Sequence, residues 1–302
     1  MVGNVCIMNY TMGFERPPTR APTIEGIDLG RAYNRATKII EASRIKEGQF
    51  VASHGEISVK NDLEKVKDFE GRHPGIDVNK ALADIFEAEM IENGELSDWW
   101  GSSAVTYKTS KYDDYFNNVD MIIEFVEEEA EGSSFLGIAA DVTFSRDIGN
   151  LSEKFETLLR KIRKGELPEV KYFHPKHPVL GDAPMFMPEV IIGANRLTVM
   201  EIANLSLKND RKALANHRIQ IMVLQQAEKQ MGILARYAEI HGQKNIAIIY
   251  RGRLEIIQNI LESKRDIAAK LAEHPAEPDE VNHGIMALAG RLERQMDHAE
   301  AA

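Results

Sequence analysis

The chain has 302 residues, 43% of them hydrophobic and 28% charged, which is the composition of a soluble globular protein larger than one typical domain. Its one cysteine, Cys6, excludes a disulfide framework and a cysteine-rich metal site and favours a cytoplasmic location. The formal net charge of -10 counts against loose nucleic-acid binding, although a local basic groove is compatible with it. No membrane partner or signal peptide is expected, because long apolar runs and a basic start followed by an apolar block are missing.

The N-terminal part is predicted to hold an irregular arm and two helices. Residues 1–24 include the stretch RPPTRAPT, whose three prolines follow no period, and they are predicted as an irregular arm. The pattern from residue 26 to about 46 is moderately amphipathic and predicts a helix. Residues 50–72 are mixed and are predicted as a short strand followed by a polar helix.

A helix and three strands are predicted next. Asp77 is a suitable N-cap and Gly94 a suitable C-terminal stop, so a helix is expected from Val78 to Asn93. Three segments rich in β-branched and aromatic residues then predict strands, and the acidic link EEEAEGSS predicts a hairpin between the second and the third. The predicted strands span residues 103–110, 118–126 and 134–145.

The remaining elements complete an α/β core and add a helical C-terminal region. A helix is predicted at 151–164, a short strand at 169–175 and an apolar strand at 188–195, followed by a helix. From about residue 209 onward the chain shows three long helical patterns. We therefore predict a core over residues 25–208 and a helical region over 209–302. Its first part, residues 209–271, is mildly basic, which suits homo-oligomer formation or a nucleic-acid path.

Three carboxylates occupy positions where a packed interface disfavours a charge. Glu89 falls on the apolar face of its helix, and Asp120 and Asp141 each interrupt an apolar strand segment. If the second and third strands pair in antiparallel fashion, with Ile123 near Ile138, the two aspartates converge at one end of the sheet. The helix that carries Glu89 can pack across that face, which predicts a cluster of the three acids.

Such a cluster predicts a metal site. Three neighbouring carboxylates repel one another and stay protonated unless a cation lies between them. Hard oxygen ligands select Mg²⁺ or Mn²⁺ over zinc, and Mg²⁺ held by one or two carboxylates plus water is common in phosphate chemistry. Each acid also has a structural alternative: Asp120 can begin its strand at the surface, Asp141 can cap a turn, and Glu89 can pair with a buried arginine.

The order of these elements and acids resembles the PD-(D/E)XK nuclease-like superfamily. The resemblance covers about residues 78–195, with Glu89 on a helix, Asp120 and Asp141 on the second and third of three strands, then a helix and a further strand. It implies an α+β fold with an αβββαβ core and a mixed central sheet. It also implies that the two aspartates, often joined by the helix glutamate, bind Mg²⁺ for hydrolysis of phosphodiester bonds of DNA.

One position departs from that family pattern. The lysine that positions the attacking water is expected two residues after the second acid, where this chain has Thr143. The best substitute is Lys154 in the next helix, whose side chain can reach back toward Asp141, and Lys108 and Lys111 are weaker candidates. Thr143 is then expected to stay near the metal as a polar group. The predicted site therefore comprises Asp120, Asp141, Lys154 and Thr143 as catalytic residues, with Glu89, Asp120 and Asp141 as metal ligands.

Two other interpretations fit the same sequence. The threonine at position 143 is compatible with a catalytically inactive nuclease-fold subunit that binds nucleic acid or another protein. The charge of -10 is compatible with an assembly protein that oligomerises through residues 209–302.

A few other side chains allow two interpretations each. Asp113 and Asp114 suit the polar start of a loop or serve as additional ligands. His174 and His177 have the spacing of a metal pair but lack a matching second pair. The dipeptide Trp99–Trp100 suits core packing or stacking on bases.

Overall fold

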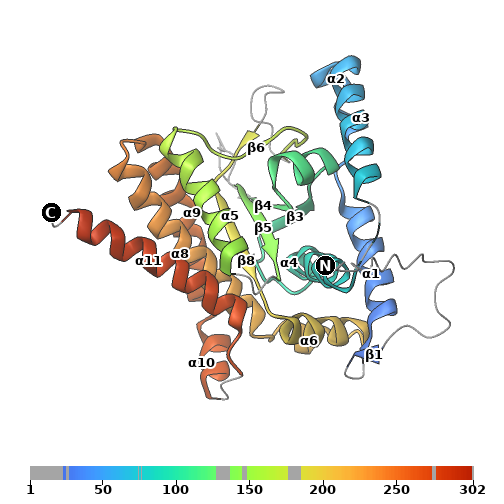
Figure 1. Ribbon diagram of the computed structural model, residues 1–302. Coiled ribbons are helices and arrows are strands. Elements are labelled where there is room, and N and C mark those ends of the chain that lie inside the picture. Colours follow the sequence, from blue (N-terminus) through green and yellow to red (C-terminus); the bar gives the residue numbers. More distant parts are fainter. Residues whose placement is uncertain are drawn as a thin grey trace, which may run out of the picture.

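The computed structural model describes most of the chain (Figure 1). The described residues are 23–24, 27–73, 75, 77–126, 137–144, 148–175, 185–273 and 277–300. Of the predicted irregular arm, only the strand β1 (Thr23–Ile24) falls within them, and it pairs with β2 (Ile27–Asp28). The predicted acidic hairpin link at 127–134 lies outside them.

The first long helix forms where the sequence predicts it. α1 (Leu29–Ser43) follows Asp28, whose side chain accepts a hydrogen bond from the backbone N–H of Arg31 at 3.0 Å and caps the helix. Its buried residues recur every three or four positions, as an amphipathic helix requires, and this face packs against the helix that carries Glu89. The prediction of a helix over 26–46 is confirmed in type, with shorter bounds.

The next segment is helical throughout, and the strand predicted at the start of residues 50–72 is wrong. A 3₁₀ helix, η1 (Glu47–Phe50), leads into α2 (Val51–His54) and α3 (Glu56–Arg72). Gly55 separates the two α-helices with φ of 78°, a conformation that glycine adopts without strain. Val59 and Val66 are buried seven residues apart, which is a helical and not an alternating period.

The helix α4 (Val78–Leu96) begins at its predicted N-cap but runs past its predicted stop. The Asp77 carboxylate accepts a hydrogen bond from the backbone N–H of Lys80 at 2.7 Å. Gly94 lies within the helix, where a Cβ atom would come 2.6 Å from a side-chain carbon of Thr106. The glycine therefore serves close packing of the helix on the sheet and does not end the helix.

The central sheet has four strands in the order β3-β4-β5-β8, and it is mixed. The first two pairs are antiparallel and the last pair is parallel. Ile123 lies opposite Ile138, as the sequence predicts. The strands are β3 (Ala104–Lys108), β4 (Met121–Phe125), β5 (Gly137–Thr143) and β8 (Glu189–Gly193). The predicted αβββαβ order and the mixed sheet are therefore confirmed.

The connection from β5 to β8 contains the predicted helix α5 (Ile148–Arg163) and a small additional pair of strands. The strand predicted at 169–175 is shorter than expected: β6 (Glu169–Val170) pairs with β7 (Met185–Phe186). Figure 1 shows the central sheet between α4 on one side and α5 with the C-terminal helices on the other. This placement leaves one end of β4 and β5 facing α5.

The helical C-terminal region shares its hydrophobic core with the sheet. One continuous cluster of buried side chains includes Ile123 of β4, Ile192 of β8, Leu234 of α8 and Ile285 of α11. The boundary near residue 208 therefore marks a change of secondary structure, and not a break between independent cores. The helices are α6 (Arg196–Leu207), α7 (Arg211–Leu214), α8 (Ile219–Ile240), α9 (Lys244–Ser263), α10 (Arg265–Glu273) and α11 (Glu280–Glu300).

Side chains from α8 and α9 cover the outer edge of β8. The side-chain amide of Gln230 accepts from the N–H of Ile191 at 2.9 Å and donates to its carbonyl at 2.7 Å. Gln226 does the same for Gly193 at 2.9 and 2.8 Å. The hydroxyl of Tyr250, on α9, accepts from the N–H of Glu189 at 3.2 Å. Because these bonds replace a further strand, the buried edge keeps no unpaired backbone groups at these positions.

Candidate functional site

Asp120 and Asp141 meet at one end of the antiparallel pair β4–β5. Asp120 lies one residue before β4, and its backbone N–H donates to the carbonyl of Ala140 at 3.1 Å. The Asp120 Oδ2 atom accepts a hydrogen bond from the backbone N–H of Val142 at 2.7 Å. These two bonds attach Asp120 to the residues on either side of Asp141, so the convergence expected from strand pairing is present in the structure.

Lys154 reaches Asp141, as its position in the helix after β5 predicts. Its Nζ atom forms an ion pair and a hydrogen bond with Asp141 Oδ1. The Lys154 side chain is 37% exposed and Asp141 is buried, so the ion pair lies at the protein surface, with the lysine on the solvent side. Burial lowers the pKa of Lys154, but the carboxylates of Asp141 and Asp120 outweigh it and hold that pKa above its ordinary value.

These residues line an open pocket of about 440 Å³. Asp120 and Asp141 come from the strand ends, and Lys154 and Lys161 come from α5. The short π-helix η2 (Asp113–Asn117) before β4 adds Asp114, the residue after it adds Asn118, and the start of β8 adds Glu189. A pocket of this size is in the range that holds a small ligand or a short segment of a larger one.

Glu189 is a carboxylate of the pocket that the sequence analysis did not single out. It pairs with Ala139 in the parallel register of β5 and β8, so it shares a sheet face with Asp141, two residues further on. Burial raises the pKa of Glu189 to about 8, with Asp141 adding to the effect and Lys161, 4.0 Å away, opposing it. An acid at the start of the apolar run PEVIIG was the signal that could have revealed it.

The electrostatics of Asp120 reflect a crowded group of acids. Burial raises the pKa of Asp120 well above its usual range. The carboxylates of Glu87, Asp141 and Asp114 raise it further, while the ammonium group of Lys108 opposes them. A positive charge added near Asp120 would oppose the effect of these carboxylates and lower its pKa.

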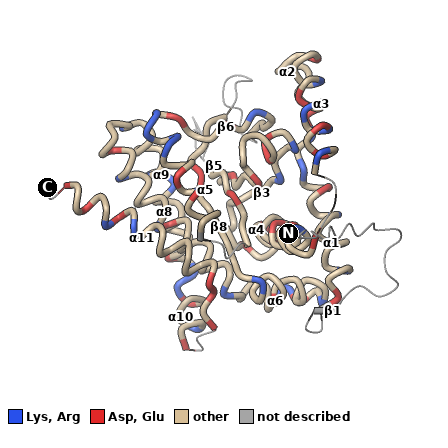
Figure 2. The backbone as a smooth tube through the Cα atoms, viewed as in Figure 1, with Lys and Arg blue, Asp and Glu red and all other residues tan. Residues whose placement is uncertain are grey.

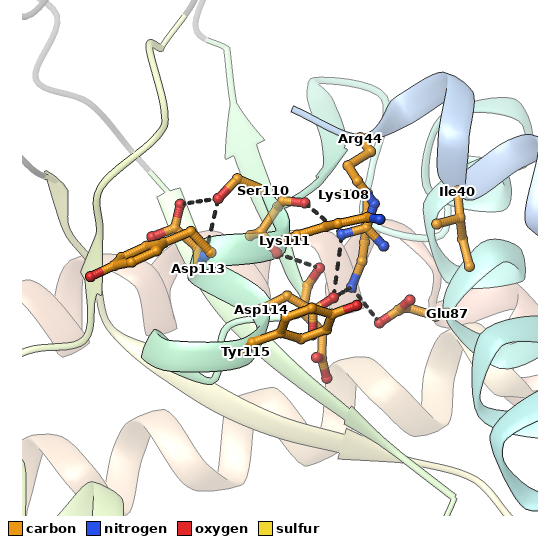
Figure 3. A network of polar contacts seen from close by, with 12 residues as sticks. Ile40, Arg44, Glu87, Lys108, Ser110, Lys111, Asp113, Asp114 and Tyr115 are labelled. Atoms are coloured by element: carbon orange, nitrogen blue, oxygen red, sulfur yellow. Dashed lines mark hydrogen bonds and ion pairs between the residues drawn. The ribbon is translucent and has the colours of Figure 1, made fainter. Parts of the chain in front are cut away.

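A buried network beneath the pocket holds Asp114 in place (Figure 3). Lys108, 1% exposed, forms ion pairs with Glu87 at 2.7 Å and with Asp114 at 2.9 Å. Arg44, at the end of α1, pairs with Asp114 at 3.3 Å. Burial raises the pKa of Glu87, and it lowers that of Lys108, but Glu87 and Asp114 hold the Lys108 pKa above its ordinary value. Lys108 is therefore a buried structural cation and does not line the pocket.

The structure does not bring Glu89 to the two aspartates. Its carboxylate accepts hydrogen bonds from Asn93 at 2.8 Å and from the hydroxyl of Ser206, and it pairs with Arg35 at 3.2 Å. The α4 glutamate that approaches the site is Glu87. The prediction that Glu89 joins the two aspartates is wrong because α4 is buried on nearly all sides, between α1, α6 and the sheet. Its apolar positions therefore do not mark a single face that points toward the sheet.

Neither Thr143 nor Lys111, the other candidates from the sequence, lines the pocket. Thr143 is buried two residues beyond Asp141 on the same face of β5, and it is not among the described residues that line the pocket. Lys111 forms a half-exposed ion pair with Glu70 at 2.7 Å, away from Asp141. Of the lysines considered from the sequence, Lys154 is thus the one that contacts the aspartates.

Most of the remaining candidates have structural roles. Asp113 accepts hydrogen bonds from the backbone N–H groups of Lys171 and Tyr172 at 2.8 and 3.0 Å, which fixes the chain before β4. His174 stacks on Phe50 with ring centroids 4.5 Å apart, and residue 177 lies outside the described residues. Trp99 and Trp100 are fully buried, so core packing is confirmed for them.

Several charges of the helical region form ion pairs between helices. Figure 2 shows basic and acidic residues interspersed along α8 and α11. Lys229 pairs with Glu293 at 2.6 Å, and Arg236 pairs with Asp297 at 2.5 Å. These pairs join α8 to α11, so part of the basic charge of residues 209–271 serves contacts between helices. A nucleic-acid path along it stays a prediction.

Neither the described residues nor known proteins point to a function apart from the pocket at the aspartates. Within the described ranges, no three or more His, Cys, Asp or Glu side chains are grouped as ligands around one point. None of the helices described is both long and apolar enough to cross a membrane. No protein-family model, curated protein or solved structure matches the chain. A function for the protein therefore has to be inferred from the chemistry of the site itself.

Proposed function

We propose that the protein hydrolyses phosphodiester bonds of DNA with a divalent cation, Mg²⁺ or Mn²⁺, held at Asp120 and Asp141. The observation that carries the proposal is the convergence of these two aspartates with Lys154 at one wall of an open pocket. When bound, the cation would neutralise phosphate charge and lower the pKa of the attacking water. The αβββαβ order and the mixed sheet support the same proposal through the resemblance to PD-(D/E)XK nucleases.

The donor set suits a hard divalent cation. Asp120 and Asp141 offer oxygen atoms only, and the pKa of Asp120 is raised first by burial and then by neighbouring carboxylates, effects that a bound cation would oppose. The hydrogen bonds from Val142 and Lys154 each engage one oxygen of a carboxylate that has two. Mg²⁺ commonly takes one or two protein carboxylates and completes its shell with water and substrate, so a third protein acid is not required. Glu89 has no part in this proposal.

Lys154 is the residue we assign to the water or the phosphate. Its ammonium group lies against Asp141, where a phosphate held near the aspartates would meet a positive charge. The ion pair fixes its position before substrate arrives, which reduces the reorganisation that the reaction needs. Thr143, on the same face of β5, supports the strand end that carries Asp141.

The alternative is a catalytically inactive nuclease-fold subunit that binds nucleic acid or protein and assembles through its C-terminal helices. Two observations favour it: Lys154 already neutralises Asp141, and Ile240 and Ile248 are 43% and 64% exposed at the α8–α9 turn. It predicts that Asp120→Ala and Asp141→Ala leave binding and assembly unchanged. Sedimentation of wild type and Ile248→Asp at several concentrations tests the self-association.

Calorimetric titration with Mn²⁺ and Mg²⁺ tests the proposal, comparing wild type with Asp120→Asn/Asp141→Asn. The matched control is Glu166→Gln, an exposed acid after α5. Each protein is then incubated with single- and double-stranded DNA in the same buffer. Cation binding and cleavage that vanish together in the double variant, and persist in the control, support hydrolysis. Binding without cleavage supports the inactive subunit, and an absence of cation binding in the wild type refutes the metal site.

A further inference from the structure

The helix α5 presents two lysines to the pocket, and only one of them is used by the proposed reaction. Lys154 and Lys161 are seven residues apart, close to two full helical turns, so they lie on the same face of the helix. Both line the pocket that contains Asp120 and Asp141. Each faces a carboxylate of a neighbouring parallel strand, Asp141 for the first and Glu189 for the second.

The two lysines differ in how firmly their carboxylates hold them. Lys154 is in direct hydrogen-bond contact with Asp141. Lys161 lies 4.0 Å from Glu189, which is too long for a hydrogen bond, and its side chain is 26% exposed. The charge of Lys161 is therefore available to an anion in the pocket.

We propose that Lys161 binds a second phosphate of the substrate strand, distinct from the phosphate that is held at Asp120, Asp141 and Lys154. At about 1.5 Å of rise per residue, the two lysines are separated by roughly 10 Å along the helix, so they suit different phosphates of one strand. The preferred substrate is then an oligonucleotide that continues past the cleaved bond, and a compound with a single phosphodiester is a poor one. This inference rests on the proposed function, since it places a phosphate at the aspartates.

A phosphate-neutralisation scan tests the assignment. A fluorescent oligothymidylate is made as a set in which one phosphate at a time is replaced by an uncharged methylphosphonate, and binding is measured by anisotropy with Ca²⁺ in place of Mg²⁺. In the wild type, replacement is expected to weaken binding roughly tenfold at two positions, as for two charge-assisted hydrogen bonds. In Lys161→Gln, the intact strand binds roughly tenfold more weakly and one of the two positions loses its effect.

Matched variants separate this role from a structural one. Lys164→Gln removes the same charge from an exposed lysine three residues further on and is expected to keep both sensitive positions. Lys161→Arg restores a positive charge and is expected to recover most of the affinity. The salt dependence gives a second readout, because losing one phosphate contact lowers the slope of log K against log salt by about 0.7 for a single strand.

The outcomes separate this inference from the proposed hydrolysis. Equal sensitivity profiles in wild type and Lys161→Gln, or equal losses in Lys161→Gln and Lys164→Gln, overturn the role of Lys161 even if Mg²⁺-dependent cleavage is observed. A position lost only in Lys161→Gln, without cleavage in Mg²⁺, upholds the second phosphate site and refutes the hydrolysis. A wild type that binds none of the oligonucleotides overturns both.

Discussion

Replacement of Lys108 by methionine is expected to destabilise the protein strongly, because it removes the cation that compensates two acids. Lys108 is 1% exposed, and its ammonium group lies 2.7 Å from Glu87 and 2.9 Å from Asp114. Methionine fills a similar volume, so a cavity contributes little, but Glu87 keeps a buried charge without a partner. Removal of one partner of a buried pair costs about 3–5 kcal/mol, which corresponds to a fall in Tm of roughly 5–8 °C for a chain of this size.

Chemical and thermal denaturation measure this effect, with Lys111→Met as the control. Lys111 also pairs with one acid, Glu70, at 2.7 Å, but both side chains are half exposed, so its loss is expected to cost at most about 1 kcal/mol. Adding Glu87→Gln to Lys108→Met removes the unpaired charge and is expected to recover part of the stability, which a double-mutant cycle resolves. A Lys108→Met variant as stable as Lys111→Met, or no coupling with Glu87, would refute the reasoning.

Three further predictions follow from other parts of the fold. Burial raises the pKa of Glu189 to about 8 from an ordinary value of 4.5, so its contribution to the free energy of unfolding is complete below about pH 4.5 and is lost as pH rises through 8. Chemical denaturation from pH 5 to 9 should therefore show a smaller decline in the free energy of unfolding for Glu189→Gln than for the wild type. An unchanged pH profile in the variant contradicts the assignment. Gln230→Leu leaves both backbone groups of Ile191 unpaired and is expected to cost about 2–4 kcal/mol of unfolding free energy, whereas the exposed Gln225→Leu should cost below about 0.5 kcal/mol. A chain ending at residue 208 loses the helices that complete the core and should lack a cooperative unfolding transition by circular dichroism; a sharp transition would show an independent domain.

The sequence by itself determined the order of the core elements and the meeting of the two aspartates. Strand pairing depends on a local period of two and on the link between neighbouring strands, so the register of Ile123 with Ile138 could be predicted before any contact was known. The position of Asp120 beside Asp141 follows directly from that register. The contact of Lys154 with Asp141 could be predicted for the same reason, since the helix that carries the lysine starts a few residues after β5.

Only the tertiary structure decided which other charges surround the aspartates. α4 is buried on nearly all sides, so its periodicity did not distinguish Glu87, which approaches the site, from Glu89, which pairs with Arg35. Glu189 reaches the pocket through the parallel pairing of β5 with β8, strands separated by a helix and a long connection. The outer edge of β8 is completed by Gln230 from a distant helix. Such arrangements depend on how elements far apart in the chain pack together, and no local pattern in the sequence records that.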